Sequence, residues 1–230
     1  GQFVVFQVDV ADETLHRAYS LCSSPTRPHT LAVTVKRVPG GKVSNYLIDT
    51  LQPGMTLRAT PPQGNFHLPA RLPAELVLLS AGSGITPMLA ISRALQDLGM
   101  PCRIHFVHSA RHAEDVIALD ELQALATLPG FRLTLLLETP SDTLPCLPGR
   151  LDSDRLAAVT AGLTDYQLLL CGPAGYLEAV HQLLLAPRYA EVPVAEEQFS
   201  PATSSPVLNP VASGEPRDGY ALRVPAFGTD

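Results

Sequence analysis

Five strand-like segments alternate with helix-like segments over residues 73–200, and this alternation restricts the fold more than any other feature. The strand-like segments lie at residues 74–80, which is continuously apolar, and at 103–109, 131–138, 166–171 and 192–199. Segments with apolar residues at helical spacing lie between them, at 87–99, 118–128, 152–161 and 174–186. Strands that are apolar on both faces and alternate with helices are typical of a parallel sheet covered on both sides. We therefore predict a doubly wound, five-stranded parallel sheet over residues 73–200.

The first 72 residues have the pattern of antiparallel strands instead. Residues 2–8 and 30–38 alternate apolar and polar side chains, whereas residues 38–44 and 51–66 contain glycine and proline that indicate turns. This pattern predicts a small antiparallel β barrel over residues 1–72. Residues 201–218 are rich in Pro, Ser, Gly and Ala without periodicity and are predicted to be a linker, after which residues 219–230 would begin another domain.

Composition excludes several classes of protein. Hydrophobic residues make up 46% and charged residues 17%, as in a folded globular chain. The net charge of −6 argues against binding to a nucleic-acid backbone, and no apolar run approaches the roughly 18 residues of a membrane span. The four cysteines lack the spacing of a zinc or iron–sulfur site, so we expect no metal site in the chain. Without a signal peptide, the expected location is the cytoplasm.

A glycine loop follows the first apolar strand of the α/β region. Gly82 and Gly84 precede a helix, where backbone amides can approach a phosphate group. The alternative is a tight strand-to-helix turn that needs glycine only for its dihedral angles. Ser83 has a glycine directly on each side, so the loop lacks the G-x-S-x-G spacing of a hydrolase nucleophile.

A second loop, Cys171–Pro173, follows the fourth strand of the predicted sheet. In a sheet ordered 3-2-1-4-5, the first and fourth strands are neighbours, and the loops at their carboxyl ends flank one crevice. We therefore expect residues 82–87 and 171–173 to face the same ligand. Taken alone, Cys171 is a small buried apolar residue.

Two further motifs in the N-terminal region have groups suited to a flat ring and to phosphate. In "RAYS", Arg17 can bind phosphate, Tyr19 offers an aromatic face and Ser20 a hydroxyl. The alternative is ordinary strand alternation with Tyr19 packed inward. The "GGKVS" motif at 40–44 predicts a glycine turn with exposed amides and a hydroxyl, suited to a second phosphate.

The motifs RAYS, GGKVS, AGSGITPM, CGPAGYL and EEQF, in this order, resemble the ferredoxin–NADP reductase superfamily over residues 1–200. The chain is most similar to members with three modules that carry a C-terminal plant-type ferredoxin domain. The NADH oxidoreductase of the hybrid-cluster protein and the reductase components of Rieske-type oxygenases are examples. Residues 108–122 are similar to the same branch.

The resemblance implies roles for individual residues. Those implied to bind the flavin are Arg17, Tyr19, Ser20, Lys42, Val43 and Ser44. Those implied to bind the pyrophosphate and ribose of the nicotinamide nucleotide are Gly82, Gly84, Thr86, Pro87, Ser109 and Arg111. The wall beside the nicotinamide would be Cys171, Gly172 and Pro173. The residues implied to set the catalytic geometry are Tyr19, Ser20, Cys171, Glu197 and Phe199.

The function implied is a flavin-dependent NAD(P)H oxidoreductase that passes a hydride to FAD and then single electrons to an iron–sulfur acceptor. Such chemistry needs two rings held together away from water, and the cofactors carry it, so no strong acid or base is required. The GGKVS motif favours FAD over FMN. Arg111 has no companion basic cluster for a 2′-phosphate, which favours NADH over NADPH.

Two departures from the family limit this expectation. The family's barrel has strands before the segment that begins at residue 1, so we expect a truncated barrel. The cysteines of a 2Fe–2S domain are absent, so the cluster is expected only in a full-length protein, whose acceptor would be an iron–sulfur domain in cis or another metalloprotein. The alternatives are an NAD(P)H:flavin reductase that releases its flavin, and a binding subunit that transfers electrons without turning over NAD(P)H.

Overall fold

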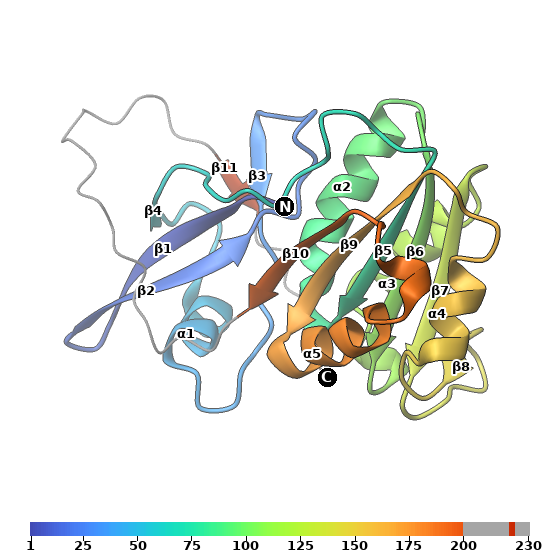
Figure 1. The fold of residues 1–230 in the computed structure, drawn as a ribbon. Coiled ribbons are helices and arrows are strands. Elements are labelled where there is room, and N and C mark those ends of the chain that lie inside the picture. Colours follow the sequence, from blue (N-terminus) through green and yellow to red (C-terminus); the bar gives the residue numbers. More distant parts are fainter. Residues whose placement is uncertain (200–220, 224–230) are drawn as a thin grey trace.

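The computed structural model describes residues 1–199 and 221–223, in which two domains lie side by side (Figure 1). The N-terminal domain contains a three-stranded antiparallel sheet, and the C-terminal domain contains a six-stranded parallel sheet. The predicted linker at 201–218 lies outside the described residues. Of the predicted domain start at 219–230, only strand β11 (Ala221–Arg223) is described, and it pairs in parallel with β3 (Thr30–Ala32).

A long hairpin organises the N-terminal domain. Strands β1 (Phe3–Val10) and β2 (Glu13–Ser20) pair along their whole length, and β4 (Arg58–Ala59) pairs with the other edge of β1. Alternate side chains of β1 form the core of the domain: Val4, Phe6 and Val8 are buried in one cluster. The alternation predicted for residues 2–8 therefore describes a real strand, although Val5 on its other face is buried as well.

Two parts of this domain differ from the prediction. The strand predicted over residues 30–38 is limited to β3 and a single bridge between Leu21 and Val33, because the described chain offers residues 34–38 no strand partner. The turn predicted at 38–44 leads directly into helix α1 (Lys42–Thr50). Val43 and Leu47 are each 2% exposed and pack against the β1 core. Their spacing of four residues was a helical signal in the sequence.

The C-terminal sheet confirms the predicted fold class and adds one short strand. The five predicted strands are β5 (Glu75–Ala81), β6 (Arg103–Ala110), β7 (Phe131–Leu137), β9 (Tyr166–Pro173) and β10 (Val194–Phe199). The observed order is β10-β9-β5-β6-β7-β8, which contains the predicted order 3-2-1-4-5. The sixth strand, β8 (Leu147–Pro148), makes only two residue pairs with β7, too few to leave a periodic pattern.

Helices cover both faces of this sheet, as the continuously apolar strands require. On one face, α2 (Ile85–Asp97) and α3 (Leu119–Leu125) pack against side chains such as Leu76 and Leu78 of β5. On the other, α4 (Ser153–Val159) and α5 (Ala174–Leu184) pack against Val77 and Leu79. Short 3₁₀ helices lie at Gly82–Gly84, Ala113–Asp115 and Pro187–Tyr189. Among the helices of the described chain, none has both the length and the apolar character needed to span a membrane.

Candidate functional site

The glycine loop after β5 packs directly on the end of β9. A Cβ atom on Gly84 would lie 2.2 Å from the carbonyl oxygen of Cys171 and 2.6 Å from the amide nitrogen of Gly172. Only a residue without a side chain fits this contact. Gly82, two residues earlier, has a φ of +52°, the left-handed region that glycine adopts readily. The structure thus brings together the two loops that the strand order placed at one crevice.

Three helices begin without any compensation of their positive ends. α1, α2 and α5 have no side-chain cap and no acidic residue in the first turn. By contrast, α3 has Asp120 and Glu121 in its first turn, and α4 is capped by Asp152, which accepts a hydrogen bond of 2.9 Å from the amide of Arg155. Uncompensated helix N-termini attract anions because their amides and dipole point outward. Among the described helices, α1 and α2 begin within the GGKVS and AGSGITPM motifs, and α5 begins directly after the CGP motif.

A contact between Ser20 and Glu197 joins the two domains at the ends of their strands. The hydroxyl of Ser20, the last residue of β2, donates a hydrogen bond of 3.2 Å to Oε2 of Glu197 on β10. Glu197 in turn lies opposite Cys171 in the pairing of β10 with β9. We call the junction formed by Ser20, Glu197 and Cys171 the seam. The residues implied for the flavin ring and for the nicotinamide therefore meet at one place.

Burial controls the protonation of the groups at the seam. Burial raises the pKa of the Glu197 carboxyl, and the hydrogen bond from Ser20 opposes that shift. The Cys171 side chain is completely buried, and burial raises the pKa of its thiol, as does the neighbouring Glu197. Cys171 is consequently a neutral thiol and not a nucleophilic thiolate. The Cys171 thiol therefore contributes packing and orientation to the seam, and not charge.

Tyr19 and Arg17 flank the seam on strand β2. The Tyr19 ring is half-buried and packs on Phe6, with ring centroids 5.4 Å apart, and burial raises its pKa to about 12. Part of the Tyr19 ring thus packs inward, as the alternative interpretation of the RAYS motif expected, and part of the ring stays accessible. Arg17 donates a hydrogen bond of 2.7 Å to the carbonyl of His16, and no carboxylate within the described residues pairs with it. Its guanidinium is therefore available to an anion.

The GGKVS motif differs in one respect from the expected phosphate turn. Ser44 is only 7% exposed: its hydroxyl accepts a hydrogen bond of 3.2 Å from the Val38 amide and lies 3.4 Å from the Gly41 carbonyl. The expectation of an exposed hydroxyl is wrong, because Ser44 closes the turn before α1. Val43 is buried in the core, and the exposed Lys42 pairs with Glu13 at 2.7 Å. Backbone amides at the start of α1 are what this motif offers to a ligand.

Further residues implied for the two cofactors lie at the start of α2, at the start of α5 and at the end of β10. Thr86 is buried and donates a hydrogen bond of 3.0 Å to the Ser83 carbonyl, and Pro87 follows it in the first turn of α2. Pro173 is the N-cap of α5. Phe199, the last residue of β10, is half-buried against the cluster under α2 and α3. Thr86 and Pro87 thus follow the glycine loop directly in the chain, and Pro173 follows Gly172.

Sequence reasoning missed Tyr176, which lies on the first turn of α5. A Cβ atom on Gly172 would lie 2.8 Å from the Tyr176 ring, so the ring covers that glycine. The hydroxyls of Tyr176 and Ser109 are both buried and near each other, yet neither makes a hydrogen bond of good geometry within the described residues. Buried hydroxyls without a firm partner suit a polar ligand. The spacing of a glycine and an aromatic residue one helical turn later was the available signal.

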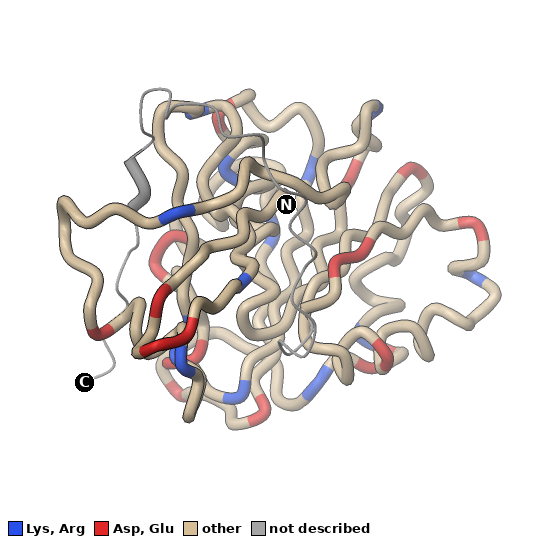
Figure 2. The backbone as a smooth tube through the Cα atoms, turned by 90° about the vertical axis from the view of Figure 1, so that its left-hand side faces the viewer, with Lys and Arg blue, Asp and Glu red and all other residues tan. Residues whose placement is uncertain are grey.

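Arg111 lies in solvent next to an acidic residue. Its side chain is 70% exposed, and its Nε is 3.7 Å from the Asp115 carboxylate. Lys36 of the N-terminal domain reaches the same carboxylate, with Nζ 3.3 Å from Oδ1. One carboxylate therefore pairs with two cations beside the end of β6. Along the described backbone, Lys and Arg positions are scattered among Asp and Glu positions (Figure 2).

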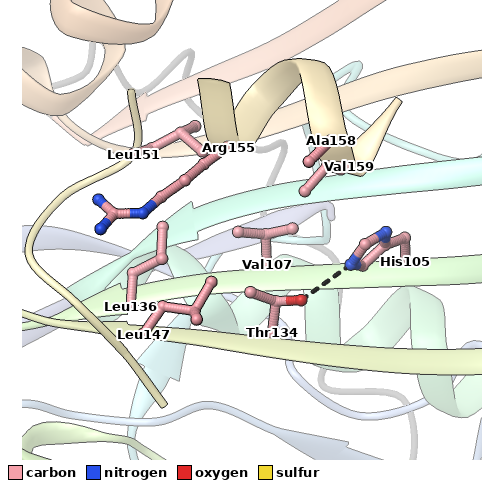
Figure 3. Close-up of a pocket in the computed structure, with 9 residues that line it drawn as sticks. All are labelled: His105, Val107, Thr134, Leu136, Leu147, Leu151, Arg155, Ala158 and Val159. Atoms are coloured by element: carbon pink, nitrogen blue, oxygen red, sulfur yellow. Dashed lines mark hydrogen bonds between the residues drawn. The ribbon is translucent and has the colours of Figure 1, made fainter. Parts of the chain in front are cut away.

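A cavity of about 170 Å³ lies elsewhere, between the sheet and α4 (Figure 3). His105 stands at one end, where its Nε2 is 2.9 Å from the Thr134 hydroxyl, and Arg155 stands at the other. Burial lowers the pKa of His105, which favours its neutral form. None of the residues implied for the flavin or the nucleotide lines this cavity. It therefore does not belong to the seam.

The fold and the seam define a class of protein: a flavin-binding antiparallel domain joined to a doubly wound dinucleotide-binding domain. Residues 1–68 match the family of oxidoreductase FAD-binding domains, and residues 78–182 match that of oxidoreductase NAD-binding domains. The chain belongs to the ferredoxin–NADP reductase superfamily. The unpaired Arg17, the uncompensated starts of α1 and α2 and the buried hydroxyls beside β6 fit the phosphates and riboses of these two cofactors.

Relatives with reductase functions share most of this chain. It is 35% identical over 205 residues to the glycine betaine monooxygenase reductase subunit of Pseudomonas aeruginosa, covering 87% of this chain and 56% of that protein. It is 37% identical over 208 residues to the ferredoxin reductase component of 3-ketosteroid-9-alpha-monooxygenase of Mycobacterium tuberculosis, covering 90% and 56%. The cytochrome P450 reductase GcoB of Amycolatopsis has a similar structure, with a TM-score of 0.73, 27% identity and coverage of 88% and 61%. The chain thus spans little more than half the length of the curated relatives that it matches.

Proposed function

We propose that this chain is the flavin- and nucleotide-binding part of an NAD(P)H-dependent reductase that supplies electrons to an iron–sulfur acceptor. The observation that carries the proposal is the seam, where Ser20 of the N-terminal domain contacts Glu197, the strand partner of Cys171. The names of the curated relatives, reductase components of two monooxygenases, support the same reading. Because those relatives are longer, the acceptor would be a domain beyond the described residues or a separate metalloprotein.

The chain's own residues bind and orient the cofactors in this proposal. When bound, FAD accepts two electrons as a hydride from the nicotinamide and releases them one at a time. Arg17 and the amides at the start of α1 would hold two phosphate groups of the flavin, which favours FAD over FMN, since FMN has one. The start of α2 would hold the pyrophosphate of the nicotinamide nucleotide. Cys171 and Phe199 would restrict the rings to one arrangement and exclude water.

In this proposal, the Ser20–Glu197 pair would hold a proton beside the flavin ring. Glu197 keeps its proton to a higher pH than an ordinary glutamate because it is buried, and Ser20 is bonded to its Oε2. The Ser20–Glu197 pair can therefore hold a proton at the edge of the ring that the family resemblance assigns to Ser20. No further acid or base is needed, since the cofactors carry the reaction.

Anaerobic titration of the full-length protein tests the proposal. The purified protein should retain FAD through gel filtration, and NADH should bleach the flavin absorbance. Flavin lost on the column together with steady reduction of added flavin would favour an NAD(P)H:flavin reductase. A retained flavin that neither NADH nor NADPH bleaches would contradict the proposal. It would favour the alternative of a binding subunit that does not turn over NAD(P)H.

Asp115 provides a test of the proposed preference for NADH. Replacing it with asparagine would release Arg111 and Lys36 from their shared partner, so that both could face a 2′-phosphate. We expect kcat/KM for NADPH to rise about fivefold to tenfold, since a partly exposed ion pair contributes about 1 kcal/mol. We expect little change for NADH. Steady-state kinetics with a dye acceptor measures both.

The matched control for this substitution is Asp154→Asn, an exposed acidic residue in the first turn of α4. It removes the same charge from a residue that pairs with neither Arg111 nor Lys36, and it should leave both values of kcat/KM unchanged. A wild-type protein that prefers NADPH, or an unchanged NADPH value in the Asp115 variant, would contradict the assignment.

A further inference from the structure

The C-terminal half of α2 carries a further connection between the domains, besides the Ser20–Glu197 and Lys36–Asp115 contacts. Asp97 accepts hydrogen bonds from the Thr26 hydroxyl and from Arg27, whose Nε is 3.0 Å from Oδ2. Arg93, one turn earlier on the same helix, donates a hydrogen bond to the carbonyl oxygen of Cys22. Both α2 side chains are therefore hydrogen-bonded to one short segment of the N-terminal domain, residues 22–27.

Arg93 is held in place from its other side. Its Nε donates a hydrogen bond of 2.6 Å to Oε1 of Glu121 on α3, and its second terminal nitrogen bonds to Oε2. This paired contact raises the pKa of Arg93, whose side chain is 23% exposed. Because Glu121 occupies two nitrogens in a fixed geometry, the third points at Cys22. The guanidinium thus joins α2, α3 and the segment 22–27.

The two ends of α2 contact different parts of the protein. Its first turn contains Thr86 and Pro87, beside the glycine loop, and its last turns contain Arg93 and Asp97. The segment 22–27 begins two residues after Ser20, which lies at the seam. An α-helix transmits a displacement along its axis because its hydrogen bonds make it stiff. A shift of residues 22–27 against α2 would therefore alter the position of the nucleotide loop relative to β2.

We propose that Arg93 and Asp97, together with residues 22–27, form a clamp. The clamp sets the distance and angle between β2, which carries the RAYS motif, and the glycine loop at residues 82–87. This inference rests on the proposed function, because it concerns the alignment of the two cofactors. Arg93 and Asp97 are positioning residues, since they lie at the far end of α2 from the glycine loop. Misplacement of reacting groups by about 1 Å can slow a reaction roughly a hundredfold.

The clamp is expected to affect rate more than stability. The Arg27 side chain is 66% exposed, and exposed ion pairs add little to folding. A structural role alone would lower the melting temperature with the rate at saturating NADH unchanged. A positioning role lowers that limiting rate while the flavin content and the melting temperature stay near those of the wild type.

The test compares Asp97→Asn with Asp49→Asn in the full-length protein. Asp49 pairs with Arg37 inside the N-terminal domain, with Nη1 3.2 Å from Oδ2, so it offers a similar ion pair that does not cross between domains. Hydrogen–deuterium exchange of the flavin-free proteins reports on residues 21–27 without any cofactor. Stopped-flow reduction by saturating NADH reports on alignment.

In the Asp97 variant we expect faster exchange over residues 21–27 and a limiting rate about tenfold lower, and neither change in the Asp49 variant. Exchanging the charges, with Arg27→Asp and Asp97→Arg together, should recover most of the rate. Exchange over residues 21–27 equal to the wild type would overturn the clamp, as would an unchanged limiting rate in a wild type that NADH reduces. A wild-type flavin that NADH does not reduce would overturn the proposed function itself.

Discussion

Alanine at position 84 is expected to destabilise the protein by about 3 kcal/mol and to remove most NADH-dependent activity. The added Cβ would lie 2.2 Å from the Cys171 carbonyl oxygen and 2.4 Å from its carbonyl carbon. Both are backbone atoms of a central strand, so they cannot move aside as a flexible side chain can. The loop must therefore lift from β9, and the start of α2 moves with it. Urea unfolding and flavin reduction by NADH measure the two effects.

Two other glycines provide controls for this substitution. Gly82 has open space around a Cβ but a φ of +52°, so Gly82→Ala should cost only about 1 kcal/mol through backbone strain. Gly175, in the first turn of α5, has open space and ordinary helical geometry, so Gly175→Ala should be neutral or slightly stabilising. If Gly84→Ala were as stable as Gly175→Ala, the direct packing of the glycine loop on β9 would be wrong.

Cys171→Ala is expected to slow flavin reduction by NADH about tenfold or more while the flavin stays bound. The side chain is completely buried at the seam, and its thiol is neutral, so its contribution is shape and not charge. Removing the sulfur leaves space in which a ring can move, and hydride transfer depends steeply on the distance and angle between the rings. Stopped-flow reduction at saturating NADH, with flavin content measured beside it, checks this expectation.

Cys102→Ala is the matched control. Cys102 is also a buried thiol, but it precedes β6 at the amino ends of the parallel strands, whereas Cys171 lies near the carboxyl end of β9. Its replacement should lower stability modestly and leave the limiting rate unchanged. Equal rates in the Cys171 variant and the wild type would remove Cys171 from the catalytic residues. Loss of flavin from the Cys171 variant would instead assign this residue to flavin binding.

Prediction from sequence succeeded where a pattern repeats along the chain. β5, β6, β7 and β9 were predicted because most of their residues are buried, which leaves largely apolar runs, whereas β10 was predicted from its place at the end of the strand–helix alternation. Their order followed from the general rules for doubly wound sheets, and the structure has it. Short elements were harder: β8 has two residues, and α1 was hidden behind the Gly40–Gly41 turn.

Residues whose role depends on side-chain packing were predicted less well than strands and helices. Ser44 was expected to offer an exposed hydroxyl, yet its bond to the Val38 amide closes a turn that no periodicity reveals. The Tyr176 ring covers Gly172, and the grip of Arg93 and Asp97 on residues 22–27 joins positions about 70 residues apart. Only the contacts of Arg93 and Asp97 depend on how the domains pack, whereas the other two depend on packing within one domain.

The sequence by itself determined the two domain types, the strand order and the motifs that mark the glycine loop, Ser20 and Cys171. The strands, helices and turns are local features, because each is encoded within a few neighbouring residues, and the strand order follows from the general rules for doubly wound sheets. Only the tertiary structure decided that Ser20 reaches Glu197, that Gly84 lies against Cys171 and that α2 is held at its far end by residues 22–27. The physical reason is that side-chain packing between distant segments sets these distances, and no spacing along one chain specifies them.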